Sequence, residues 1–151
     1  MSRNSAVGIV LLLLFGSYGT SQQPQEAPIR FGIHPRLEDY PQATARQSLA
    51  SAISALEQNQ VAYALAQLTD PDFVDRRVKE LYGGNFDELV KEATTKLADS
   101  PGTIKELNRF LREGEWRGSE SSTSVTLKDI KDRQVFLRKV GTRWYLENRQ
   151  K

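Results

Sequence analysis

The sequence contains no cysteine, and this absence excludes several kinds of chemistry at once. A chain of 151 residues without a thiol forms no disulfide, no thiolate nucleophile and no cysteine-type zinc or iron–sulfur site. It also has a single histidine, His34, so a histidine cluster that could hold a metal ion is excluded as well. We therefore expect no cofactor, no metal and no covalent cross-link, and we expect packing alone to stabilise the fold.

The chain also lacks a strong excess of either charge. Its 21 Lys and Arg residues oppose 19 Asp and Glu residues, the formal net charge is +2, and the two signs are interspersed. A basic face of the kind that binds a phosphate backbone is not indicated, so we expect no nucleic acid as a partner. A phosphate-cradling glycine loop and a nucleophile elbow are likewise missing from the sequence.

No apolar run is long enough to cross a bilayer comfortably. The longest run, from Ala6 to Phe15, would rise about 15 Å as a helix, half of a hydrocarbon core of roughly 30 Å. Arg3 gives a positive start and small residues follow, so we predict a signal peptide over residues 1–19. The protein would then be exported, periplasmic or extracellular, and would meet a membrane only through this signal. An uncleaved membrane anchor is the alternative.

Residues 20–41 are rich in glutamine and proline, with prolines at positions 24, 28, 35 and 41. Proline at this density blocks helix and favours extended, solvated chain, so we predict a linker. His34 is expected to be exposed within it. The alternation of Ile29, Phe31 and Ile33 leaves a second interpretation open, in which these residues lie as a short strap on the domain.

Helical periodicity dominates the middle of the chain. Apolar residues at i, i+3, i+4 and i+7 predict helices over 42–59, 61–68, 71–81, 86–98 and 104–112, and a single long helix over the first two is the alternative. Asp70, Asn85 and Thr103 are expected to cap three of them. In the third helix, four residues are expected to face inward: Phe73, Val74, Val78 and Leu81.

The end of the chain alternates like a sheet with one buried face. Every second residue is apolar in three runs that contain Val125, Leu127, Val135, Leu137, Trp144 and Leu146. Gly141-Thr142 suits a type II′ hairpin, the charged run 128–133 is predicted to be a turn, and 115–118 a short strand. The fold class is therefore α+β, with N-terminal helices packed on a C-terminal antiparallel meander in one domain, residues 42–151.

The helix-first, meander-last order resembles the nuclear transport factor 2-like superfamily, which has a cystatin-like cone fold. Members commonly begin with a long alanine- and leucine-rich helix, here Ala45 to Asp70, and end with a strand reading V-G-x-x-W-Y-L, here Val140 to Leu146. The resemblance covers about residues 40–148 and is closest to small exported domains of unknown function. Members usually place strands among the helices, whereas we expect none over 42–112, so an unrelated α+β fold stays open.

Enzymes of this superfamily, such as ketosteroid isomerases and scytalone dehydratases, use Asp/His or Tyr/Asp pairs inside the cone. The predicted domain has no histidine, so the resemblance leaves only Tyr/Asp chemistry, in an isomerase- or dehydratase-like enzyme. The available groups are Tyr63, Tyr82, Tyr145, Asp70, Asp72 and Asp75. No catalytic motif aligns with them, and we predict no catalytic residue.

The function we predict is that of an exported, non-catalytic binding or interaction domain. A small apolar ligand would lie among four aromatic residues: Trp116, Phe136, Trp144 and Tyr145. The alternative for the two tryptophans is a place in the core. A protein partner is the second possibility, in the form of a homodimer through the sheet, because Phe136 and Val140 flank Arg138 on the face opposite Val135 and Leu137.

Overall fold

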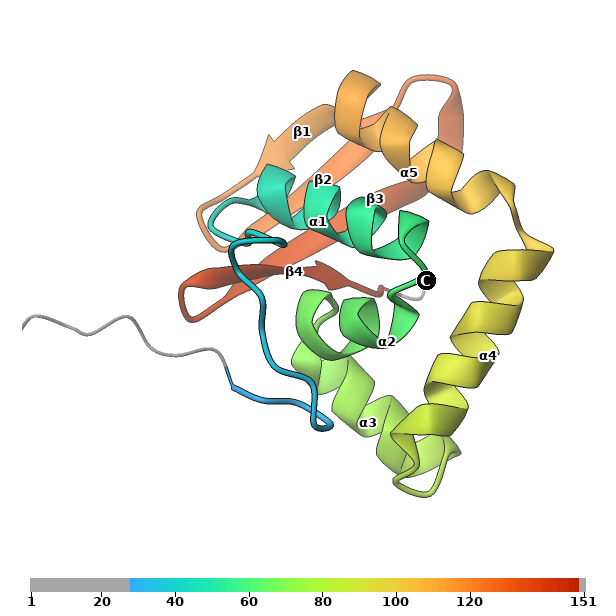
Figure 1. The fold of residues 1–151 in the computed structure, drawn as a ribbon. Coiled ribbons are helices and arrows are strands. Elements are labelled where there is room, and N and C mark those ends of the chain that lie inside the picture. Colours follow the sequence, from blue (N-terminus) through green and yellow to red (C-terminus); the bar gives the residue numbers. More distant parts are fainter. Residues whose placement is uncertain (1–27, 150–151) are drawn as a thin grey trace, which may run out of the picture.

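The structure, a computed structural model, describes residues 28–149 and confirms the α+β class (Figure 1). The expected signal peptide and the first part of the linker lie outside the described residues. Helices come first and strands last. The elements are α1 (Ala45–Glu57), α2 (Val61–Tyr63), the π-helix η1 (Ala64–Leu68), α3 (Pro71–Leu81), α4 (Phe86–Asp99), α5 (Gly102–Glu113), β1 (Glu115–Gly118), β2 (Ser122–Leu127), β3 (Ile130–Val140) and β4 (Arg143–Glu147).

The four strands form an antiparallel meander in the order β1-β2-β3-β4. Gly141 has a φ of 61° and Thr142 a negative φ, as a type II′ hairpin requires. The prediction of a turn over 128–133 is wrong, because the turn is confined to Lys128 and Asp129 and β3 begins at Ile130. The charged residues that follow sit on an exposed stretch of strand, where alternating charges are tolerated.

Helices α1 and α5 lie on one face of the sheet (Figure 1), which we call the covered face. The predicted alternation holds there, since Val125 and Leu137 are fully buried and Trp144 is nearly so. The core cluster between the layers contains Leu49, Ile53, Phe110, Val125, Leu127, Leu137 and Trp144. At roughly 1.5–3 kcal/mol for each large side chain removed from water, this cluster is the main source of stability.

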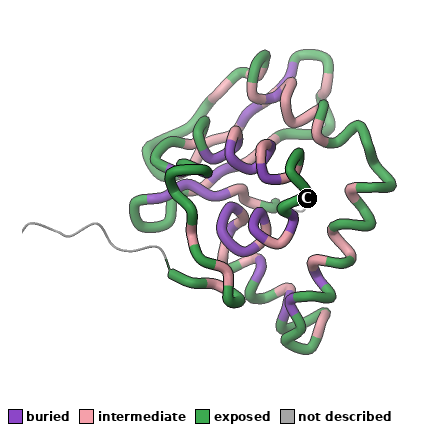
Figure 2. Tube along the Cα trace, viewed as in Figure 1, coloured by how far each residue is buried: buried purple, intermediate pink, exposed green. Residues whose placement is uncertain are grey.

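A second group of helices extends beyond the edge strand β4. Thr69 forms a parallel bridge with Leu146, and the Asp70 N–H donates to the Leu146 carbonyl at 2.7 Å. Two smaller clusters fill this part, one around Tyr63 and Leu68 and the other around Val74, Val78 and Phe86. Figure 2 shows the buried residues gathered under α1 and around α2, while α4 is mostly exposed.

Several helix details depart from the sequence-based expectation. The segment expected as one helix over 61–68 is a single α-turn followed by π-helix, and the Thr69 hydroxyl donates to the Ala64 carbonyl at 2.9 Å, closing the wider turn. Leu81, expected inside, lies at the end of α3 and is 61% exposed. Thr103 is not a cap, since α5 already begins at Gly102. Asp70 and Asn85 cap α3 and α4 as predicted.

Residues 28–41 run along the helical layer to the start of α1, and we call this segment the strap (Figure 1). Its tip is a tight turn in which Arg30 and Ile33 exchange backbone hydrogen bonds. Phe31 has a φ of 50°, and its ring stacks on that of Phe86 with centroids 4.1 Å apart. Of the three alternating residues, Ile33 is partly buried, whereas Ile29 is 56% exposed.

Two buried glutamines tie the strap, the helices and β4 together. The Gln42 amide donates to the carbonyls of Gln67 and Trp144, at 3.0 and 2.8 Å. The Gln67 amide donates to the carbonyls of Pro28 and Ile33, at 3.1 and 2.8 Å. Because a buried amide must find partners, these bonds hold the strap at one place on the domain.

Among residues 28–149, no helix combines the length and apolarity needed to cross a bilayer.

Candidate functional site

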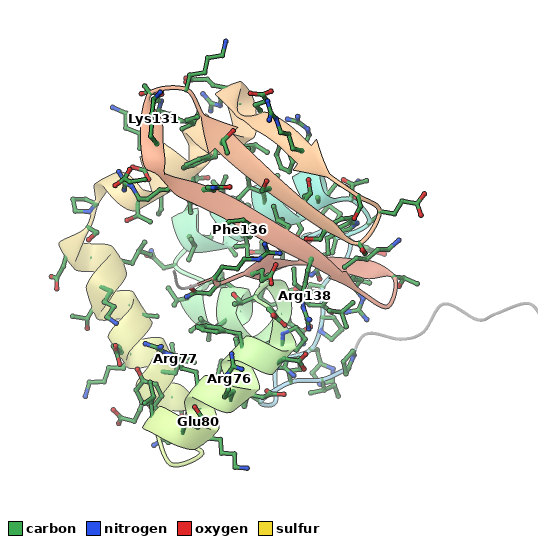
Figure 3. All side chains as sticks on the ribbon, turned by 180° about the vertical axis from the view of Figure 1, so that it is seen from behind. Arg76, Arg77, Glu80, Lys131, Phe136 and Arg138 are labelled. Carbon is green, nitrogen blue, oxygen red and sulfur yellow. The ribbon has the colours of Figure 1, made fainter. Side chains whose placement is uncertain are left out.

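The sheet face opposite α1 and α5 is the open face, which Figure 3 shows from behind with Phe136 and Arg138 on β3. On β4, Arg143, Tyr145 and Glu147 share this face, because they alternate with Trp144 and Leu146, which pack into the core. Arg138 lies directly across from Tyr145, and Phe136 across from Glu147. The open face is therefore a mixed surface of aromatic and charged side chains.

The structure does not bring the four predicted ligand-binding residues together. Trp144 belongs to the core on the covered face and is 7% exposed. Trp116 packs against the same core, and the guanidinium of Arg46 lies 4.7 Å from its ring centroid. Phe136 and Tyr145 lie on the open face instead. A single pocket lined by all four residues is thus incompatible with the pleat of the sheet.

Phe136 is partly covered by the chain's own C-terminal residues. The guanidinium of Arg149 lies 4.5 Å from the Phe136 ring centroid and donates to the Ser122 hydroxyl at 3.2 Å. A hollow of about 200 Å³ remains beside this contact, between β1, β2 and Arg149. Val140, the other apolar residue of this face, is 37% exposed at the end of β3.

Apart from Tyr145, the tyrosines and aspartates available for catalysis have structural partners. Asp70 accepts a hydrogen bond from the Asp72 N–H as the cap of α3, and both carboxylates pair with Arg138, at 3.0 and 2.7 Å. Asp75 pairs with Arg30 at 2.7 Å, and Tyr82 donates to Glu92. These contacts hold α3 to the strap, to β3 and to α4.

Tyr63 also serves the strap rather than a reaction. Its hydroxyl accepts a hydrogen bond from the Arg36 N–H at 2.9 Å, and the Arg36 guanidinium lies 4.8 Å from its ring centroid. Burial raises the pKa of the Tyr63 hydroxyl, and the Arg36 hydrogen bond and the charges of Arg36 and Arg143 oppose this only in part. A phenol with a raised pKa stays protonated at neutral pH and is a poor general base.

A pocket of about 330 Å³ lies beside the β3–β4 turn, and we call it the hairpin pocket. Three parts of the chain that are distant in sequence form its wall: the beginning of the strap, the first residue of α3, and the hairpin. The lining residues are Pro28, Arg30, Pro71, Val140, Gly141, Thr142, Arg143 and Tyr145. Of the residues predicted to bind ligand, Tyr145 alone lines this pocket.

Arg143 is the unusual residue of the hairpin pocket. The residue is 9% exposed, and its Nη1 atom is buried with no hydrogen-bond partner in the described part of the chain. Within residues 28–149 no carboxylate forms an ion pair with it. Taking a charge out of water without a partner costs several kcal/mol in general, so such a group indicates a site that an anion would complete.

Arg30, the second arginine of the pocket, is already satisfied. Its Nε donates to the Ala66 carbonyl at 2.8 Å, and its two terminal nitrogens bind the Asp75 carboxylate, at 2.7 and 3.3 Å. Nη2 also donates to the Pro71 carbonyl at 3.4 Å. Arg30 therefore builds the wall of the pocket, and its charge is neutralised by Asp75.

The sequence alone gives no signal that identifies Arg143 as a site residue. It stands between Gly141 and Trp144 in the predicted last strand, at a position whose alternation places it opposite the core. A charged residue on that face is ordinary when the face is solvated. Arg143 is buried because the strap and the start of α3 lie over this end of the face.

The described part of the chain holds no cluster of three or more His, Asp or Glu side chains that could bind a metal ion. Comparisons with protein-family models, curated proteins and solved structures found no match to this chain, so the resemblance to the nuclear transport factor 2-like superfamily stays a prediction.

Proposed function

We propose that the protein is an exported, non-catalytic binding domain that holds a small anionic ligand in the hairpin pocket. The observation that carries the proposal is the buried Arg143 in the wall of that pocket, whose Nη1 atom has no hydrogen-bond partner among the described residues. A volume of about 330 Å³ lies at the lower end of the range of 300–1,000 Å³ that is usual for small-molecule sites.

The contacts around the pocket support binding better than catalysis. Arg138 engages both Asp70 and Asp72, and Arg30 engages Asp75, so the nearby carboxylates are occupied. A guanidinium stays protonated and does not transfer protons at neutral pH, but it binds carboxylate and phosphate groups well. The arrangement can therefore recognise an anion, and it offers no acid–base pair that would turn it over.

The experiment titrates the purified protein with acetate, hexanoate, sulfate and inorganic phosphate. Isothermal calorimetry measures binding, and thermal unfolding measures the effect of each anion on the melting temperature. We expect at least one anion to bind and to raise the melting temperature. Arg143→Met should abolish that shift because Met keeps the length of the side chain and removes the charge. Arg117→Met is the matched control, since the Arg117 side chain is 74% exposed and already pairs with Glu115.

The proposal would be overturned if the anions bound wild type and Arg143→Met equally well. It would also be overturned if no anion bound at millimolar concentration. The enzyme alternative has a separate readout. If the protein converted a ketosteroid or a dehydratase-type substrate and Asp70→Asn removed that activity without unfolding the chain, Asp70 would be more than a cap and an ion-pair partner.

A further inference from the structure

We infer that the ligand of the hairpin pocket is a small monocarboxylate with an apolar body, held by the Arg143 guanidinium and the Tyr145 hydroxyl. This inference rests on the proposed function and adds the chemical class of the ligand. Three properties of the pocket support the inference: its charge, its hydrogen-bond donors and its apolar surface.

The charge of the pocket matches one negative charge. Two arginines line it, but the Asp75 carboxylate neutralises Arg30 through contacts at 2.7 and 3.3 Å. Arg143 is then the single unneutralised charge among the described lining residues. A planar guanidinium binds a carboxylate through two parallel hydrogen bonds, which satisfies both groups together.

The α3 side of the pocket offers few N–H donors for a phosphate group. Phosphate sites at helix N-termini use several free backbone N–H groups, but α3 begins with Pro71, which has none. The next N–H, that of Asp72, donates to the Asp70 side chain at 3.1 Å. On the hairpin side, Val140 and Arg143 pair with each other across the turn. The first two residues of α3 thus offer no free backbone N–H to a phosphate oxygen.

Much of the wall is apolar. Pro28 and Pro71 come from the strap and α3, Val140 flanks the turn, and the ring of Tyr145 comes from β4. An anion without an apolar part, such as sulfate, would leave this apolar surface exposed to water, whereas the alkyl or aryl group of a ligand would cover it. A volume of about 330 Å³ suits a body of a few carbon atoms.

Tyr145 supplies a second polar group at the right place. It follows Arg143 by two residues on β4, so both side chains rise from the same face of the strand. The hydroxyls of Tyr40 and Tyr63 take part in hydrogen bonds within the described residues, but the Tyr145 hydroxyl does not, although Tyr145 is 6% exposed. It is free to donate to a carboxylate oxygen that Arg143 holds.

The test compares four probes on the wild-type protein: acetate, hexanoate, hexanamide and inorganic phosphate, each titrated by calorimetry at one ionic strength. Hexanoate should bind about a hundredfold more tightly than acetate, because four further methylenes leave water. Hexanamide has the same body without the charge and should bind at least about tenfold more weakly than hexanoate, as expected for one lost charge-assisted contact.

Three variants assign the roles of the two side chains. Arg143→Met should remove hexanoate binding, and Arg143→Lys, which keeps the charge but not the planar fork, should restore only part of it. Tyr145→Phe should weaken hexanoate about fivefold, the usual effect of one hydrogen bond. Arg117→Met serves again as the control.

The outcomes separate this inference from the proposed function. Phosphate binding that exceeds hexanoate binding and disappears in Arg143→Met would overturn the inference and leave the anion-binding function standing. Equal affinities for acetate and hexanoate would also overturn the inference and leave the anion-binding function standing, because the apolar wall would then contribute nothing to affinity. Equal binding of hexanoate and hexanamide, unchanged in Arg143→Met, would overturn both.

Discussion

The covered and open faces of the sheet differ most clearly on β4, where consecutive residues have opposite roles. Trp144 and Leu146 face α1 and α5 and complete the core. Arg143 and Tyr145, which alternate with them along β4, point to the open face and line the hairpin pocket. On β3, Leu137 is fully buried whereas its neighbour Arg138 binds two aspartates at the start of α3.

The difference teaches that one strand can present apolar side chains to the core and polar side chains to a pocket. Because side chains alternate, a residue of the open face can change while the packing of the covered face is kept. Both faces of β4 are nonetheless buried, one by helices and the other by the strap and the start of α3. Burial under the helices should stabilise the fold more than burial under the strap and the start of α3, and four predictions test this difference.

The largest effect should come from the covered face. Leu137→Ala removes a fully buried side chain from the core cluster, and we expect a loss of about 2–5 kcal/mol in the free energy of unfolding, measured with urea. Phe136→Ala, one residue away on the open face, should cost less than half as much, because Phe136 is only partly buried beneath Arg149. Equal losses would mean that the two faces contribute equally to the core.

The next largest loss of stability should come from removing a hydrogen bond to the edge strand β4. Gln42→Ala removes the amide that donates to the carbonyls of Gln67 and Trp144. We expect a loss of about 1–2 kcal/mol, because both acceptors are buried but the Ser48 hydroxyl still donates to the Trp144 carbonyl at 2.9 Å. Gln134→Ala, at an exposed position of β3, is the control and should be nearly neutral. An unchanged stability in Gln42→Ala would show that the Trp144 N–H bond to the Gln42 carbonyl suffices to hold the edge.

Two arginines of the open face should respond in opposite directions. Arg138→Met should destabilise the protein by about 1 kcal/mol, because it leaves Asp70, whose side chain is 10% exposed, without its ion pair. Arg143→Met should be neutral or stabilising in the absence of ligand, because it replaces an unpaired buried charge with an apolar side chain. Thermal unfolding at two salt concentrations measures both. A clear destabilisation by Arg143→Met would mean that its charge is compensated within the fold.

The smallest effect should come from the strap, and it depends on pH. Tyr63→Phe removes the acceptor of the Arg36 N–H bond, and we expect a loss of about 0.5 kcal/mol at neutral pH. The pKa of Tyr63 is raised by burial, so above the ordinary value of 10.0 the unfolded chain loses a proton that the folded protein keeps. The contribution of Tyr63 is therefore complete below pH 10 and is lost as the pH rises through the folded-state pKa.

The difference in stability between wild type and Tyr63→Phe should accordingly narrow above pH 10. Hydrogen exchange supplies a second readout, since the variant should speed exchange in the strap and leave the amides of β2 and β3 unchanged. A constant difference from pH 8 to pH 11 would contradict the assigned burial of the hydroxyl.

The local features of the fold followed well from the sequence. Asp70 and Asn85 cap α3 and α4 as predicted, and the apolar alternation over β2, β3 and β4 identifies the covered face residue by residue. The errors lie where tertiary contacts override local preference. The charged residues after Asp129 extend β3 because β2 pairs with Ile130, and the π-helix η1 places Gln67 where the strap needs a donor.

The candidate site was only partly predictable for the same reason. Tyr145 was chosen for its aromatic ring, but Trp116, Phe136 and Trp144 were grouped with it although the period of a strand divides them between two faces. Arg143 was overlooked because a charge on an open face carries no signal by itself. Its importance depends on Pro28 and Pro71, which lie far away in the sequence.

By itself, the sequence determined the order of helices and strands and the apolar face of each, because hydrophobic periodicity and capping act over a few neighbouring residues. Only the tertiary structure decided which arginine has a carboxylate partner and where a pocket remains. Those properties depend on contacts among the strap, the start of α3 and the hairpin, which no local pattern records.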